Sequence, residues 1–198
     1  MASRCAGSWP APRTRSRGWP PPVKSGCLAG RGARFTTVGV QHIEVYARSP
    51  APLPAVWRWL ADAGSYASWS MLTRSDLEWE GVPAPDGVGA IRRLGRGGSV
   101  SREQVVVFEP PTHLGYTLLS GMPVIGYRAD VHLSEDGSGT LIAWRSRFEP
   151  RVPGTGLLVR WFFQRVLTGF ARRLARQAAL GPVPVRPQLP DLANRPLP

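Results

Sequence analysis

Two ionisable residues, Arg92 and Glu103, fall on neighbouring expected strands, at positions whose alternation faces an apolar interior. A charged side chain in such surroundings costs free energy unless it is paired, so we expect Arg92 and Glu103 to pair across the two strands. The pair has two chemical uses: it moves a proton as an acid–base couple, or it orients a carbonyl group of a bound molecule. If the assigned alternation of the strands is off by one residue, both side chains face solvent instead, and that alternative stays open.

Five aromatic side chains are the candidates for contact with a ligand: Trp69, Tyr116, Tyr127, Trp144 and Phe148. The last four occupy same-face positions on three successive expected strands. Aromatic rings dominate both protein cores and ligand pockets. Tyr116 and Trp144 therefore fit core packing as well as ligand contact, and both interpretations stay open.

The residues that usually bind metals or attack substrates are few and scattered. The three histidines, His42, His113 and His132, lie on or beside three different expected strands, and we expect them to be exposed to solvent. A metal site needs several converging ligands, so we expect no metal. Both cysteines, Cys5 and Cys27, precede the expected domain, and a Gly-x-Ser-x-Gly motif is absent from the sequence. The glycine-rich residues 95–98 join two strands rather than opening a helix, so they indicate a hairpin turn, and we expect no cofactor.

The elements that position these residues follow from periodicity and turn residues. Residues 40–48 alternate as a first strand, a helix starts near Pro54 and runs to Gly64, and a short helical turn leads from Tyr66 to Trp69. Six more strands are expected at about residues 76–80, 89–94, 102–108, 114–120, 127–133 and 140–148. Short connections between successive strands make this an antiparallel meander.

A long amphipathic helix closes the chain at about residues 157–180. We expect its apolar face to consist of Val159, Phe162, Phe163, Val166, Phe170, Leu174 and Ala178. Its polar face is expected to carry Arg165, Arg172, Arg173 and Arg176. The fold class is therefore α+β, with a curved antiparallel sheet of about seven strands wrapped around this helix.

The formal net charge of +12 is concentrated towards the start of the chain. Residues 1–37 hold seven basic residues and no acidic one, whereas residues 38–180 hold sixteen basic and twelve acidic residues. A nucleic-acid-binding domain gathers basic residues on one face with exposed aromatic side chains between them. The interspersed charges of residues 38–180 therefore argue against nucleic acid as a partner.

Three segments make up the expected domain organisation: residues 1–37, 38–180 and 181–198. The first is rich in Pro, Gly, Ser and Arg without periodicity, so we expect disorder. Three interpretations remain: a basic tail, an organellar transit peptide, or a start site assigned too early, with the true initiator near residues 36–40. The Pro-rich end, residues 181–198, is also expected to be disordered.

The composition suggests where the protein works. The sequence has no apolar run approaching the roughly 18–20 residues needed to span a bilayer, and its first residues lack the continuous apolar stretch of a secretory signal. Lys24 is the only lysine among 25 basic residues, a bias typical of GC-rich bacterial genomes. We expect a cytoplasmic bacterial protein.

Short motifs spread over residues 40–178 carry a family resemblance. They are Ala51-Pro52, Val56-Trp57, Leu60, Asp62, Tyr66 and Trp69; Gly87 and Gly89; Glu103, Val105, Phe108-Glu109-Pro110-Pro111, Leu114 and Tyr116; and Gly139-Thr140, Ile142, Trp144 and Phe148. In their order they resemble the START-like superfamily with its helix-grip fold, and most closely its SRPBCC group, also called the polyketide cyclase/dehydrase and lipid-transport group. The resemblance implies a cavity between sheet and last helix, entered near Trp69 and residues 153–156.

Three functions remain open at this stage, because a fold does not settle function. The first is the binding of a small hydrophobic ligand of lipid, polyketide or aromatic type. The second is a polyketide cyclase or dehydratase in which Arg92 and Glu103 move protons. The third is a membrane-surface or partner-binding module, in which the arginines of the last helix make weak contact with anionic surfaces. The sequence leaves the oligomeric state and the identity of the ligand open.

Overall fold

The computed structural model describes residues 39–181. The expected basic segment, residues 1–37, and the expected Pro-rich tail after residue 181 lie outside the described residues. Within the described range the chain forms one antiparallel sheet, three α-helices and a 3₁₀ turn.

The seven strands follow the chain in a meander, except that the first strand pairs with the last. They are β1 (Gln41–Ser49), β2 (Arg74–Trp79), β3 (Ile91–Arg96), β4 (Ser99–Glu109), β5 (His113–Ser120), β6 (Val124–Asp136) and β7 (Gly139–Pro150). Their order in the sheet is β1-β7-β6-β5-β4-β3-β2, with every pair antiparallel. The expected antiparallel sheet of about seven strands is confirmed, although most strands extend beyond their expected bounds.

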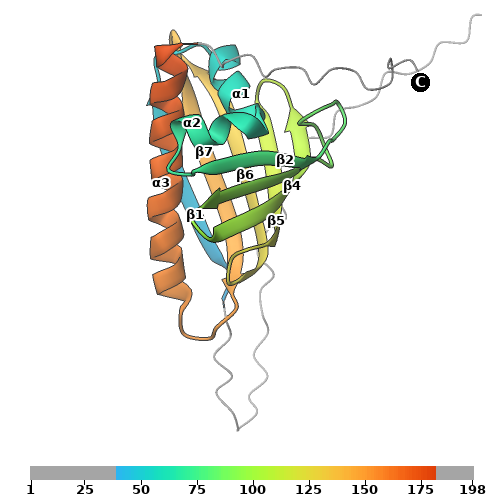
Figure 1. Cartoon of the computed structure of the whole chain (residues 1–198). Helices are drawn as coiled ribbons and strands as arrows, with labels where there is room; N and C mark the ends of the chain where they lie inside the picture. Colours follow the sequence, from blue (N-terminus) through green and yellow to red (C-terminus); the bar gives the residue numbers. More distant parts are fainter. Residues whose placement is uncertain (1–38, 182–198) are drawn as a thin grey trace, which may run out of the picture. The chain divides into compact units, whose positions relative to one another are not determined.

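The helices lie on one side of this sheet (Figure 1). Helix α1 (Leu53–Ala61) begins with a proline near its first turn, where the missing N–H leaves no hydrogen bond unmade. The 3₁₀ turn (Ala63–Ser65) and α2 (Tyr66–Trp69) follow. The long α3 (Gly156–Leu180) runs along the sheet, against β1 and β7, and meets α1 near its C-terminal end. The two short helical segments after the first strand, and the long closing helix, are therefore where the sequence predicted them.

Strand β7 confirms the alternation that defines the inner face. Thr140, Ile142, Trp144, Ser146 and Phe148 are all buried, and the residues between them are less buried or exposed. Strand β7 pairs with both β1 and β6, so residues opposite its buried positions are also on the inner face. Val131 of β6 and Val45 of β1 lie opposite Trp144, and both are buried.

Helix α3 departs from the expected apolar face at its start. The prediction placed Phe162 against the sheet, but this side chain is 48% exposed, so the prediction was wrong for Phe162. The buried stripe is instead Phe163, Leu167, Ala171, Leu174, Ala175 and Ala178. Three of these are alanines, whose small side chains bring the helix close to the sheet. Since the stripe is narrow, Phe162 falls on its edge and reaches the surface.

None of the helices in residues 39–181 combines the length and the apolar character that crossing a bilayer requires.

Candidate functional site

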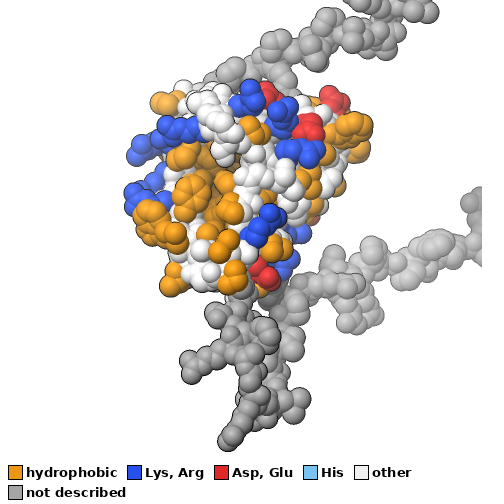
Figure 2. Space-filling model, turned by 60° about the horizontal axis from the view of Figure 1, so that its bottom comes forward, with side chains coloured by type: hydrophobic (Ala, Val, Ile, Leu, Met, Phe, Trp, Pro, Cys, Tyr) orange, Lys and Arg blue, Asp and Glu red, His pale blue; other side chains and the backbone are white. Residues whose placement is uncertain are grey.

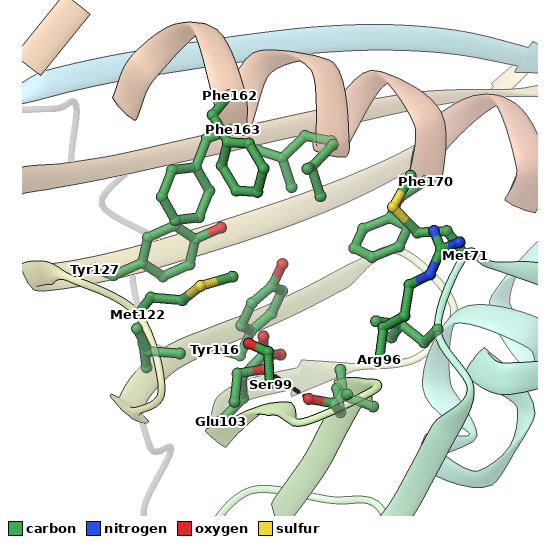
Figure 3. Close-up of a pocket in the computed structure, with 17 residues that line it drawn as sticks. Met71, Arg96, Ser99, Glu103, Tyr116, Met122, Tyr127, Phe162, Phe163 and Phe170 are labelled. Carbon is green, nitrogen blue, oxygen red and sulfur yellow. Dashed lines mark hydrogen bonds between the residues drawn. The ribbon is translucent and has the colours of Figure 1, made fainter. Parts of the chain in front are cut away.

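A cavity of about 330 Å³ lies between α3 and the inner face of the sheet. Its walls are mainly apolar: Leu94 and Leu118 of the sheet and Val166 of α3 line it. The rings of Phe163 and Phe170 reach it from α3 (Figure 3). Ligand pockets in proteins usually measure about 300–1,000 Å³, and a cavity of roughly 150 Å³ already holds benzene. The space therefore suits a two-ring aromatic molecule or an acyl chain of medium length.

The mouth of the cavity lies between the β3–β4 turn and α3. Arg96, Ser99 and Phe162 line the cavity and are also exposed, so they stand at its opening. The β5–β6 turn adds Met122. This turn depends on Gly121, which has a φ of +102° and packs so closely on β4 that a Cβ would lie 2.2 Å from the carbonyl oxygen of Val100.

The resemblance placed the opening near the loops around Trp69 and residues 153–156, and the cavity lining agrees with the first of these only in part. Trp69 is buried, with only 4% of its surface exposed, and the cavity lining includes neither it nor that loop. Met71, two residues after Trp69, does line the cavity. The opening is thus displaced towards the hairpin that joins β3 and β4.

Tyr116 and Tyr127, two of the five predicted ligand contacts, line the cavity (Figure 3). Burial raises the pKa of both phenols, so each remains a neutral hydroxyl at physiological pH. The Tyr116 hydroxyl accepts a hydrogen bond of 3.1 Å from Nε1 of Trp144. This bond holds the Tyr116 ring at a defined angle on the cavity wall.

The other three predicted contacts, Trp69, Trp144 and Phe148, lie behind the wall rather than on it. Trp144 stacks on Phe170 with ring centroids 5.9 Å apart, and Trp69 meets the edge of the same ring at 6.1 Å. Phe148 packs on Phe163 at 5.0 Å. All three support rings that line the cavity, so they influence its shape without reaching its interior.

Glu103 is an ionisable side chain on the cavity wall (Figure 3). Burial disfavours its charged form and raises the pKa to about 7, against a smaller opposing effect of the positive charge of Arg92. Near neutral pH both its protonation states are therefore populated. A carboxyl group in this condition accepts or donates a proton with little free-energy cost.

Arg92 lies on the same inner face, directly opposite Glu103 in the β3–β4 register. Its side chain is completely buried. The guanidinium donates through Nη1 to the Tyr66 hydroxyl at 3.0 Å, and its carbon lies 5.4 Å and 5.5 Å from the ring centres of Tyr66 and Tyr116. Contact with two aromatic faces is a favourable setting for a cation that burial removes from water.

The side chains of Arg92 and Glu103 therefore face the inner side of the sheet, and the alternative in which both face solvent is excluded. Among the ion pairs of residues 39–181, however, none joins Arg92 to Glu103, so the expected direct pair is not formed. Within residues 39–181 the Nε and Nη2 groups of Arg92 have no hydrogen-bond acceptor. We call the following arrangement the polar corner: Glu103 lines the cavity, and the buried Arg92 lies opposite it in the strand register, behind the cavity wall.

The histidines lie on the outer face of the sheet, away from the cavity. His113 and His132 face each other across β5 and β6 and stack with ring centroids 4.0 Å apart. His113 Nε2 lies 3.0 Å from a carboxylate oxygen of Asp130. His113 and His132 are partly buried, so the expectation that they are exposed to solvent holds only in part. In residues 39–181 the structure contains no group of three or more side chains arranged to hold a metal ion.

Sequence reasoning missed most of the mouth. Met71, Met122 and Phe162 were not among the predicted contacts, although they line the cavity. Met71 lies between α2 and β2, and Met122 lies between β5 and β6, in connecting segments where periodicity gives no information. Phe162 was assigned to the helix–sheet contact because its spacing fits the apolar stripe.

Comparison with known proteins places this geometry in context. The family described as "Polyketide cyclase / dehydrase and lipid transport" matches residues 40–179. None of the curated proteins compared with the chain matches it.

Several solved structures share the fold. A START superfamily protein from Mycobacterium smegmatis is 15% identical, with a TM-score of 0.60 over 70% of this chain and 97% of its own. The Zhui aromatase/cyclase from a Streptomyces species is 20% identical, with a TM-score of 0.59 over 73% of this chain and 100% of its own. The protein XoxI from Bacillus cereus is 18% identical, with a TM-score of 0.59 over 69% of this chain and 94% of its own. At these identities the likeness concerns the fold, which is the START-like helix-grip fold.

Proposed function

The chain belongs to the polyketide cyclase/dehydrase and lipid transport family, and from that premise we propose that it binds a small hydrophobic molecule in the cavity between α3 and the sheet. The observation that carries the proposal is the cavity itself, with about 330 Å³ of space, mainly apolar walls and an opening at the surface. A cytoplasmic location in a bacterium, expected from the composition, remains part of this proposal.

The polar corner suggests what kind of hydrophobic molecule fits best. A purely aliphatic ligand would leave the Glu103 carboxyl group facing an apolar partner, which costs free energy. A molecule with a carbonyl or hydroxyl group accepts or donates a hydrogen bond there while its apolar part fills the remaining space. We therefore favour a flat aromatic or polyketide-like ligand, or a lipid with one polar end, that carries oxygen near its buried end.

Competition with an environment-sensitive apolar dye tests this proposal. The dye should bind the full chain at micromolar concentration, and bicyclic aromatic ketones should displace it. Val166→Trp fills the cavity from α3, since Val166 lines it, and should weaken dye binding at least about tenfold by steric exclusion.

Leu180→Trp provides the matched control, because Leu180 lies on the same helix, is 80% exposed and is outside the cavity lining. This variant should bind the dye as the unmodified chain does. Equal binding by Val166→Trp and the unmodified chain would show that the dye occupies another site and would contradict the proposal.

A second candidate function, proton transfer to a bound polyketide-like substrate, rests on the position of Glu103 on the cavity wall, where burial raises the pKa of its carboxyl group to about 7. General acid–base catalysis is most effective when the catalytic pKa lies near the working pH. The aromatase/cyclase from Streptomyces shares this fold. In this role Glu103 would remove a proton next to a substrate carbonyl and return it to the departing oxygen.

Glu103→Gln distinguishes the two functions, because glutamine keeps the shape of the side chain and loses the exchangeable carboxyl proton. If the protein is an enzyme of this kind, the variant should retain ligand binding and lose most of its turnover of polyketide-like substrates. If the unmodified protein converts none of these substrates while it binds them, the catalytic candidate is excluded and the binding proposal stands.

A further inference from the structure

The first turns of α3 are apolar on the side that faces away from the sheet. Leu157, Leu158, Trp161 and Phe162 are exposed by 77%, 67%, 60% and 48%. On its other side the same segment buries Phe163 and Leu167. A helix on a protein surface normally has one apolar stripe and a polar opposite face. On this segment the polar face is interrupted by these four apolar side chains, with Arg160 and Arg165 exposed among them. Its outer side is therefore suited to a boundary between an apolar and a polar environment.

We call Leu157, Leu158, Trp161 and Phe162 the mouth patch, because it adjoins the opening of the cavity. Phe162 belongs to both, since it lines the cavity and is exposed. Figure 2 views the molecule from the end at which α3 begins and shows hydrophobic side chains gathered there, with basic side chains around them. The opening of the apolar cavity and the exposed apolar surface are therefore continuous.

The charged residues of α3 are all basic. Helix α3 contains five arginines, Arg160, Arg165, Arg172, Arg173 and Arg176, and no acidic residue. The guanidinium carbon of Arg165 lies 5.5 Å from the centre of the Trp161 ring, so a cation accompanies the tryptophan of the mouth patch. Exposed Leu, Trp and Phe side chains next to arginines are the pattern of helices that lie in the interface of a bilayer with anionic lipids.

We propose that the mouth patch docks the protein onto an anionic lipid bilayer, with the opening of the cavity turned towards the membrane. The leucines and aromatic rings enter the boundary between headgroups and acyl chains, and Arg160 and Arg165 contact lipid phosphates. The docking is a property of this surface and does not require a ligand in the cavity. If the proposed function also holds, an apolar molecule passes between bilayer and cavity without crossing water.

Cosedimentation of the full chain with vesicles tests the docking. The chain should bind vesicles of phosphatidylglycerol and phosphatidylcholine, and bind much more weakly to phosphatidylcholine alone. Leu158→Ser with Trp161→Ser should lower the partition coefficient by about tenfold or more, because two apolar side chains no longer enter the bilayer. Both residues are exposed, so the melting temperature should not change.

The arginines provide a matched pair of variants. Arg160→Gln with Arg165→Gln should weaken binding about 25-fold, since each basic residue close to an anionic surface contributes about fivefold. Arg172→Gln with Arg173→Gln removes the same charge further along α3 and should change binding by less than about threefold. This control is needed because residues 1–37 contain seven basic residues.

Three outcomes would overturn the proposal. Equal losses in the two arginine pairs would mean that diffuse positive charge binds the vesicles. Unchanged binding after Leu158→Ser with Trp161→Ser would mean that the mouth patch does not enter the bilayer. A concentration-dependent dimer that these two serines abolish, without vesicle binding, would assign the patch to a second copy of the chain. Val166→Trp should still bind vesicles, so failure of the docking is distinguishable from failure of the cavity proposal.

Discussion

Replacing Glu103 by glutamine should change how the stability of the protein depends on pH. In the folded chain, burial raises the pKa of this carboxyl group to about 7, from an ordinary value of 4.5. Between these two values the folded state holds a proton that the unfolded state has released. The free energy of unfolding therefore decreases as pH rises through this window, and the contribution of the neutral Glu103 is lost above about pH 7.

The size of the effect follows from the shift. One unit of pKa corresponds to about 1.4 kcal/mol, so the full shift is worth about 3 kcal/mol between low and high pH. Between about pH 5.5 and about pH 8 the expected loss is about 2 kcal/mol at most. Glutamine carries no titratable proton, so Glu103→Gln should lack this loss.

Urea denaturation at the two pH values measures the difference. The unmodified protein should lose about 2 kcal/mol more than Glu103→Gln on going from about pH 5.5 to about pH 8. Glu80→Gln, which removes an exposed carboxylate, should follow the unmodified protein. Parallel pH profiles of the unmodified protein and Glu103→Gln would refute the argument that Glu103 is held in a largely desolvated position.

Two further predictions concern helix α3 and the buried cation. Leu174→Ala should lower the free energy of unfolding by about 3 kcal/mol, because Leu174 is fully buried; Arg173→Ala, its exposed neighbour, should cost less than about 0.5 kcal/mol. Chemical denaturation compares the two variants. Similar losses of unfolding free energy would show that α3 does not turn Leu174 to the core and Arg173 to solvent. Arg92→Met should raise the pKa of Glu103 further, because the Arg92 charge lowers it; carbon-13 NMR of the carboxyl group should show the rise, and an unchanged pKa would remove Arg92 from the polar corner.

The sequence predicted the sheet well because its last strand alternates strictly. Ile142, Trp144 and Phe148 share one face of β7, and both neighbours of this strand inherit that face through their register. In a meander, one strand with a clear alternation pattern therefore indicates the inner face of neighbouring strands whose own pattern is weaker. Strands β3 and β4 alternate less clearly, and for this reason the direction of Arg92 and Glu103 stayed open until the register of the two strands was known.

The cavity was harder to predict than the fold, because it depends on the distance between α3 and the sheet. Alternation identifies inward-facing rings but does not separate those on the cavity wall, such as Tyr116, from those beneath it, such as Trp144. That difference depends on how far α3 inserts, which the small side chains of Ala171 and Ala175 determine. The mouth of the cavity is formed by turns, and the periodicity of a sequence does not predict where its turns lie in space.

The most direct test of the central claim uses the methionine methyl groups. The chain has three methionines, and two of them, Met71 and Met122, line the cavity. With carbon-13-labelled methionine, a bicyclic aromatic ketone should shift both of these methyl signals and give intermolecular nuclear Overhauser effects to both. The Met1 signal should stay unchanged. If the ketone binds and neither the Met71 nor the Met122 methyl group shows a contact, the ligand lies outside the cavity and the account is contradicted.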